Sequence, residues 1–370
     1  SILDNNHNAV SGTVSSHEVT IDGDSETSVT LNPSVNSPVL WSTDNPKLYI
    51  LKTVVKDKNG ELIDEYHTTF GYREISWDAD TGFSLNGKPM KLKGVCLHHD
   101  QGALGAVQEY DALYRQLMIL KDMGCNAIRT SHNSTSKILI NICNEIGMLV
   151  IEEFFDGWDV SKDNNTYDFS KYFNETLTPE NKAIGAKGQK WYEYVIEHTI
   201  YRDAHDPCVI AWDIGNELGN VDDIYATGNY EEISTAIVNL CKELDPDRAV
   251  LQGNNSPIND NDTYKVELLK AIDNKMDVIG GNYATWNWQE VMNDSDDPRS
   301  SKPFVATESA SALSNRGVYY TMGKDEENKQ ITAYDTYHVD WGNNAAEAWY
   351  YVATNDWFSG EFIWTGFDYI

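Results

Sequence analysis

The first 75 residues contain short runs rich in Val, Thr and Ser in which apolar and polar positions alternate, and this alternation predicts β-strands. The expected strands cover residues 10–14, 17–21, 28–31, 48–56 and 62–70. An Asn59-Gly60 turn joins the last two strands as a hairpin. A series of short strands of this kind favours an immunoglobulin-like β-sandwich over residues 1–75, although the strands are fewer than a complete sandwich needs.

From about residue 90 the pattern changes, because short apolar runs now alternate with longer segments whose apolar positions recur with the period of a helix. Strands are expected at 91–97, 125–129, 148–153, 208–212, 249–252, 277–280, 303–306 and 360–364. Helices are expected at 110–123, 134–146, 189–204, 230–244, 263–273, 286–293 and 343–356. Gly124 and Gly147 follow the first two helices, at the position where glycine commonly ends a helix. Eight strands in this rhythm predict the α/β fold class, with a (β/α)8 TIM barrel over residues 76–370.

The pattern stops at Ile370 before an eighth helix, so the sequence predicts a barrel that lacks its last helix. In that arrangement we expect the outer face of strand eight, including Phe362, to expose apolar surface and to promote association. A long loop, 156–187, follows strand three, and long loops in compact domains are often functional.

Composition narrows the class of protein. A chain of 370 residues is long enough for one barrel and one smaller domain. It carries 28 Lys and Arg against 58 Asp and Glu, a net charge of −30, so neither nucleic acid nor an anionic membrane is expected as a partner. No apolar run approaches the ~20 residues of a membrane helix. The five cysteines include no C-x-x-C pair, which indicates buried free thiols instead of a disulfide framework or a zinc site.

Candidate chemistry comes from two barrel strands, each of which ends on a glutamate. The apolar run Cys208–Trp212 leads to Asn216-Glu217, and the run Pro303–Ala306 leads to Glu308. A single glutamate at a strand end is usually a solvated rim residue. Two glutamates at the carboxyl end of one barrel, where such barrels carry their active sites, fit the acid and the nucleophile of a glycoside hydrolase.

Seven short motifs strengthen this interpretation. They are F-G-Y-R-E at 70–74, F-S-L-N-G-K at 83–88, K-G-V-C-L-H-H-D at 93–100, I-R-T-S-H-N at 128–133, G-N-E at 215–217, T-E-S at 307–309 and F-I-W-T-G-F-D-Y at 362–369. With these motifs in this order, the span from about Trp41 to Ile370 resembles the core of glycoside hydrolase family 2, which contains β-galactosidases, β-glucuronidases and β-mannosidases. The resemblance implies an immunoglobulin-like domain before a TIM barrel, and a retaining mechanism with carboxyl groups ~5 Å apart.

The resemblance also implies roles in catalysis. Glu217 matches the acid/base, which needs a raised pKa, and Glu308 matches the nucleophile, which should stay ionised. Asn216 is expected to hydrogen-bond the sugar 2-hydroxyl, although an Asn after Gly can also be a plain turn residue. Arg129 is expected to hold Glu308 ionised through a charge-assisted pair. Tyr283, at the end of strand six, matches a tyrosine that donates to the nucleophile.

Four further residues are expected around the sugar. His98 and Asp100 end strand one and match family positions close to the sugar. His132 follows strand two and could donate to a sugar hydroxyl. Trp364 matches a tryptophan that forms the floor of the sugar pocket, although it could equally pack in the barrel core. Three more tryptophans are candidates for a wall that faces the leaving group: Trp158, Trp286 and Trp288.

No cofactor is expected. Some β-galactosidases of the family bind Mg²⁺ beside the acid/base through a Glu and a His after strand three. The corresponding segment here, residues 151–155, reads I-E-E-F-F without a histidine, so a metal is disfavoured. K-G-V-C-L-H-H-D-Q-G-A-L-G and T-E-S-A-S-A-L-S-N-R-G resemble the bacterial β-galactosidase branch, which implies a small β-galactoside or oligosaccharide as substrate. The alternatives are a β-glucuronidase of the same family and, from another class, an inactive or sugar-binding core fragment. A homo-oligomer stays open.

Overall fold

The computed structural model describes residues 1–162, 165, 167–178, 187–218, 229–255, 263–283 and 285–369. Parts of the long loop 156–187 therefore lie outside the described residues. No helix among the described residues is long and apolar enough to cross a membrane. All five cysteines have free thiols, as the sequence predicted, and four of them are buried.

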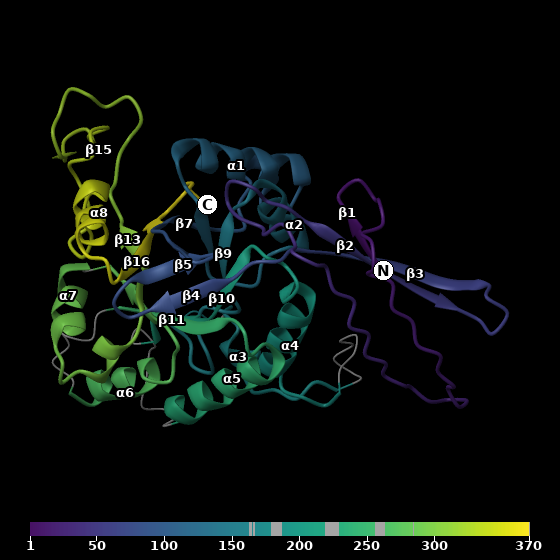
Figure 1. The fold of residues 1–370 in the computed structure, drawn as a ribbon. Helices are drawn as coiled ribbons and strands as arrows, with labels where there is room; N and C mark the ends of the chain where they lie inside the picture. The colour runs from purple at the N-terminus through teal and green to yellow at the C-terminus, as the bar shows by residue number, and fades with distance from the viewer. Residues whose placement is uncertain are drawn as a thin grey trace.

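Eight parallel strands close into a barrel at the centre of the molecule (Figure 1). In barrel order they are β7 (Leu92–Leu97), β8 (Ala127–Thr130), β9 (Leu149–Glu153), β10 (Val209–Asn216), β11 (Ala249–Asn255), β12 (Ile279–Asn282), β13 (Phe304–Ala310) and β16 (Phe358–Trp364). Because β16 pairs with β7, the sheet has no free edge. The predicted TIM barrel is confirmed, with strand bounds that differ from the expected ones by a few residues.

Helices surround the barrel, in chain order between the strands (Figure 1). They are α1 (Tyr110–Met123), α2 (Lys137–Ile146), α4 (Trp191–Asp203), α5 (Tyr230–Leu244), α6 (Thr263–Asp273), α7 (Thr285–Asn293) and α8 (Ala345–Thr354), with the short α3 (Ser170–Phe173), η1 (Gly102–Leu104) and η5 (Pro298–Ser301). The helix α1 ends at Gly124 with a φ of 106°, and α2 ends at Gly147 with a φ of 75°, conformations that favour glycine.

The N-terminal region is a three-stranded antiparallel sheet of β1 (Ile2–Asp4), β2 (Tyr49–Lys56) and β3 (Leu62–Phe70). Figure 1 shows β2 and β3 as a long hairpin that extends away from the barrel. The strands expected at 10–14, 17–21 and 28–31 are not formed. Their apolar side chains, such as Val14 and Ile21, are exposed, so the alternation in the sequence has no opposite surface to bury against. A domain boundary near residue 75 stays a prediction.

Side-chain hydrogen bonds join this N-terminal region to the barrel. The buried indole of Trp41 donates to the carbonyl of Asn144 at 2.9 Å. The guanidinium of Arg73 donates to the carbonyls of Pro207 and Val209 at 2.6 and 2.5 Å. The strands β4 (Ile75–Asp78), β5 (Gly82–Leu85) and β6 (Lys88–Pro89) form a small sheet, in which the F-S-L-N-G-K motif at 83–88 forms a hairpin. The buried ring of Phe83 anchors this sheet in the barrel core.

The expectation that Phe362 is exposed on the outer face of strand eight is wrong. Phe362 is fully buried, and its ring lies so close to Gly94 on β7 that a Cβ there would be 2.2 Å from it. The alternating side chains Glu361 and Ile363 instead face outward, into a groove of about 470 Å³ that is also lined by Met123 of α1 and residues of α8. Successive side chains of a strand point to opposite faces, so the buried Phe362 lies on the opposite face of β16 from Glu361 and Ile363.

Candidate active site

The two glutamates at the strand ends line the same cavity, which has a volume of about 650 Å³. Glu217 follows β10 directly, and Glu308 lies within β13 with only 3% of its surface exposed. The backbone N–H of Glu217 donates to the carbonyl of Gly253 at 2.6 Å. Glu217 and Tyr283 both have positive φ angles, 43° and 52°. Such backbone strain often accompanies a functional site.

Arg129 is the centre of the charge network below this cavity. The side chain, on β8, is fully buried. Its Nη1 donates to Oε1 of Glu308 at 2.9 Å, its Nε to Oδ2 of Asp213 at 2.8 Å, and its Nη2 lies 3.0 Å from Oε2 of Glu153. Burial alone would lower the pKa of Arg129, but the three carboxyl groups more than offset this and raise it. The predicted contact with Glu308 is present, and Arg129 also holds two carboxyl groups that the sequence analysis missed.

Glu308 differs from the expected fully ionised nucleophile. Burial raises the pKa of Glu308 to about 7, against the opposing effects of His132, Arg129 and a hydrogen bond from Tyr283. The neighbouring charge of Glu217 also raises it. Glu308 is therefore fully ionised only above neutral pH, because the closed barrel removes water from its carboxylate.

Asn216 and Asn282 connect the two glutamates. Nδ2 of Asn282 donates to Oδ1 of Asn216 at 2.9 Å and to Oε1 of Glu217 at 3.1 Å. Thr307, beside Glu308, donates to Oδ1 of Asn282 at 2.6 Å and so fixes the orientation of its amide. Asn282 was not among the expected site residues. Its signal is its place between an apolar strand and Tyr283, which is the same kind of strand end that identified Glu217.

His132, His98 and Trp364 form an aromatic group at the edge of the cavity. The ring of His132 stacks on Trp364 with centroids 5.2 Å apart, and His98 meets Trp364 edge-on at 4.8 Å. Nδ1 of His132 lies 3.0 Å from Oε2 of Glu153, and its Nε2 lies 3.6 Å from Oε1 of Glu308. Burial and nearby positive charge lower the pKa of His98 to about 4, so this ring is neutral at pH 7.

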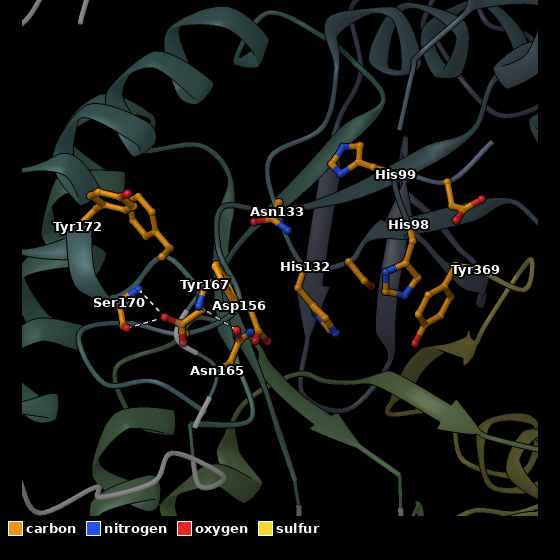
Figure 2. Close-up of a pocket in the computed structure, with 15 residues that line it drawn as sticks. His98, His99, His132, Asn133, Asp156, Asn165, Tyr167, Ser170, Tyr172 and Tyr369 are labelled. Atoms are coloured by element: carbon orange, nitrogen blue, oxygen red, sulfur yellow. Dashed lines mark hydrogen bonds between the residues drawn. The ribbon is translucent and has the colours of Figure 1, made fainter. Parts of the chain in front are cut away.

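A second cavity, of about 610 Å³, adjoins the first and shares His132 with it (Figure 2). His98 and Asp100 line this second cavity, together with Asn133 and Asp156. Figure 2 shows His132 between Asp156 on one side and His98 on the other. Among the residues that the structure describes, Nε2 of His98 is buried without a hydrogen-bond partner. The structure thus brings the predicted site residues to two adjoining cavities, except Arg129, which is buried and contacts Glu308 from below, and it places His98 and Asp100 apart from the two glutamates.

The three tryptophans expected near the leaving group have different positions. Trp286 lines the cavity that contains the glutamates, and Trp341, which the sequence analysis did not consider, lines it too. Trp158 and Trp288 are fully buried, so they are packing residues and not cavity walls. The indole of Trp158 donates to the carbonyl of Ile214 at 2.8 Å, which fixes the strand that carries Glu217.

One cluster in the described residues has the spacing of metal ligands, because single ligand atoms of His132, Glu153 and Asp156 all lie within 4.8 Å of one another. These atoms already have partners. Oε2 of Glu153 faces both Arg129 and His132 at 3.0 Å, and Oδ1 of Asp156 accepts from Nζ of Lys162 at 2.6 Å. A Mg²⁺ ion needs near-octahedral oxygen ligands at about 2.0–2.1 Å. In the described residues, the oxygen atoms of Glu153 and Asp156 that could coordinate Mg²⁺ are therefore already engaged by Arg129, His132 and Lys162.

Comparisons with known proteins agree with this geometry. Residues 79–369 match the TIM barrel domain of glycosyl hydrolases family 2, and residues 1–73 match a second domain of that family, its immunoglobulin-like part. The chain is 36% identical over 378 residues to Beta-galactosidase BoGH2A of Bacteroides ovatus, covering 91% of this chain and 41% of that protein. It is 31% identical to a putative beta-glucuronidase of Formosa agariphila, covering 90% of this chain and 31% of that protein.

Solved structures show the same likeness. A glycosyl hydrolase family 2 member from Bacteroides cellulosilyticus superposes with a TM-score of 0.77 at 31% identity, covering all of this chain and 39% of that one. A beta-glycosidase from Bacteroides vulgatus gives a TM-score of 0.73 at 30% identity, covering 91% of this chain and 42% of that one. The chain thus spans less than half the length of the relatives that it matches.

Proposed function

The chain belongs to glycosyl hydrolase family 2, and from this premise we propose that its site hydrolyses terminal β-D-galactosides by a retaining double displacement. One observation carries the proposal. Glu217 and Glu308 line a single cavity, where Glu308 is paired with a buried Arg129 and Glu217 accepts from Asn282. The likeness to Beta-galactosidase BoGH2A supports galactose as the sugar.

The two glutamates divide the reaction between them. In the first step a carboxylate oxygen of Glu308 attacks the anomeric carbon while the bond to the leaving oxygen breaks, and Glu217 gives its proton to that oxygen. In the second step Glu217, now ionised, takes a proton from water. The water oxygen attacks the anomeric carbon and releases Glu308. Two inversions at the same carbon leave galactose with its original β-configuration.

The surrounding residues support these steps. Arg129 and Tyr283 stabilise the carboxylate of Glu308, because both contribute to lowering its pKa. The amides of Asn216 and Asn282 can bind the sugar hydroxyl groups next to the reacting carbon. The stacked rings of His132 and Trp364 offer an apolar face for the C–H surface of a sugar ring.

The charge of the two cavities favours a neutral sugar over a uronic acid. Their described lining includes six carboxyl groups and no Lys or Arg: Asp100, Asp156, Asp168, Glu217, Glu308 and Asp340. The carboxylate of a glucuronide would meet these groups, and two like charges about 4 Å apart repel by about 1–4 kcal/mol between water and a protein surface. A β-glucuronidase is the second candidate, because the relative from Formosa agariphila is 31% identical.

A chromogenic assay tests the proposal. The protein should hydrolyse a nitrophenyl β-D-galactoside faster than the matching β-D-glucuronide, and Glu308→Gln should abolish this activity while Glu327→Gln, an exposed turn residue, should not. A higher rate with the glucuronide would favour the second candidate. Saturable galactose binding without turnover would instead support the alternative of a different class, a sugar-binding core without catalytic activity.

A further inference from the structure

Two basic residues face the carboxyl groups around the proposed acid/base. Arg129 contacts Glu153, Asp213 and Glu308. Lys162, from the loop after β9, contacts Asp156 instead, with its Nζ 2.6 Å from Oδ1. The lysine side chain is only 13% exposed, so most of its aliphatic length is packed inside the protein. An ammonium group placed this way is a fixed part of the site and not a solvated surface charge.

Asp156 in turn holds Asn216 at two points. Its backbone carbonyl accepts from the N–H of Asn216 at 2.7 Å, and its Oδ1 accepts from Nδ2 of Asn216 at 3.3 Å. Since Asn216 directly precedes Glu217, a shift of Asp156 would move the backbone that carries the proposed acid/base. The ammonium group of Lys162 thus acts on Glu217 through two intervening residues.

The same ammonium group blocks the cluster that has metal-ligand spacing. His132, Glu153 and Asp156 could offer three ligand atoms to a divalent ion, but Oδ1 of Asp156 is already bound to Lys162. A dication there would bring a positive charge beside Lys162, and the two would repel.

We propose that Lys162 is the built-in cation of this cluster: its ammonium group replaces a divalent ion and positions Asn216 and Glu217 through Asp156. The expected effect of Lys162 on turnover rests on the proposed function, whereas its expected effect on metal binding does not. Lys162 is a positioning residue, because it acts on the reaction through Asp156 and Asn216.

The test compares Lys162→Met, Lys162→Arg and the control Lys187→Met in the full chain. Lys187 belongs to the same loop, but its side chain is 75% exposed and pairs with Glu197 away from the cavities. Lys162→Met should reduce kcat at least about tenfold with little change in KM or Tm, since a misplaced acid slows the chemical step more than binding. Lys162→Arg should recover part of the loss, and Lys187→Met should behave as wild type.

Binding of Mn²⁺, followed by its electron paramagnetic resonance signal, gives a readout that needs no activity. We expect Lys162→Met to bind Mn²⁺ at least about tenfold more tightly than wild type, because the ligands are freed, and EDTA to leave the wild-type rate unchanged. Equal Mn²⁺ affinity of the two proteins, or wild-type kcat in Lys162→Met, would overturn the inference. An inactive wild type with the predicted difference in Mn²⁺ binding would contradict the proposed function and leave the built-in cation standing.

Discussion

Replacing Arg129 by Ala should lower both the free energy of unfolding and the rate of turnover. The two losses have different physical causes, so they can be predicted separately. The substitution leaves Glu153, Asp213 and Glu308 buried without their shared cation. Removing one partner of a buried ion pair typically costs about 3–5 kcal/mol. Burial already raises the pKa of Glu153 to about 8, and the pKa of Asp213 and Glu308 to about 7, and without the guanidinium these values rise further.

The cost in stability should therefore depend on pH. In the folded variant these carboxyl groups keep their protons at a pH where the wild type has lost them, so the variant gains stability relative to wild type as the pH falls. Each proton retained is worth about 1.4 kcal/mol per pH unit. We expect Arg129→Ala to lose about 3–5 kcal/mol at about pH 8.5 and clearly less at about pH 6.5. Denaturant unfolding at the two pH values measures the difference.

The rate of turnover should fall by more than the loss of folded protein alone would explain. A cation next to a carboxylate lowers its pKa by about 1–3 units, so loss of Arg129 should reduce the ionised fraction of Glu308 at pH 7, where its pKa of about 7 leaves roughly half of it ionised, by about 5- to 500-fold. Arg129→Lys keeps the charge but cannot reach three carboxyl groups with one ammonium, and should be intermediate. A loss of stability that is the same at both pH values, or below about 1 kcal/mol, would refute the reasoning.

Two further predictions concern the neighbours of the glutamates. Because burial raises the pKa of Glu308 to about 7, kcat/KM should fall as the pH drops below about 7. Tyr283→Phe removes a hydrogen bond that lowers this pKa, so in a pH–rate profile the acidic limb of the variant should lie at higher pH than that of the wild type. An acidic limb at the same pH in both proteins would contradict this. Asn282→Ala removes the hydrogen bonds to Asn216 and Glu217, so it should lower kcat about tenfold or more. Steady-state kinetics that show only a higher KM would instead limit Asn282 to substrate binding.

The barrel was readable from the sequence because its strands and helices differ in period. The helices at 110–123, 230–244 and 263–273 have the predicted bounds, since the spacing of apolar positions is a local feature of the sequence. At the N-terminus the hairpin expected at 48–56 and 62–70 is formed by β2 and β3, whereas the strands expected between residues 10 and 31 are not. Residues 10–31 alternate suitably, yet they form no strand, because β-propensity has meaning only with a partner strand.

Only those residues of the candidate site that lie at strand ends or in family motifs could be predicted from the sequence. Glu217, Glu308 and Arg129 lie at or near the carboxyl ends of the predicted strands. Their residue types and their positions in the barrel could therefore both be inferred from the sequence. Asp213 lies inside β10 and Glu153 is the last residue of β9, and the role of both depends on Arg129 from a different strand. Which side chains of a strand face the barrel interior also depends on register, and for this reason Phe362 was misplaced. Trp158 lies in the loop after β9, where its burial depends on packing against the segment around Ile214.

The most direct test of the central claim is to trap the proposed intermediate on Glu308. A 2-deoxy-2-fluoro-β-D-galactoside with a good leaving group slows both steps, and the second more than the first, so a retaining enzyme should accumulate the covalent glycosyl ester. Intact mass spectrometry should show one added fluorogalactosyl group, and peptide sequencing should place it on Glu308. A label on another residue, or no label together with release of α-galactose from a normal substrate, would contradict the account.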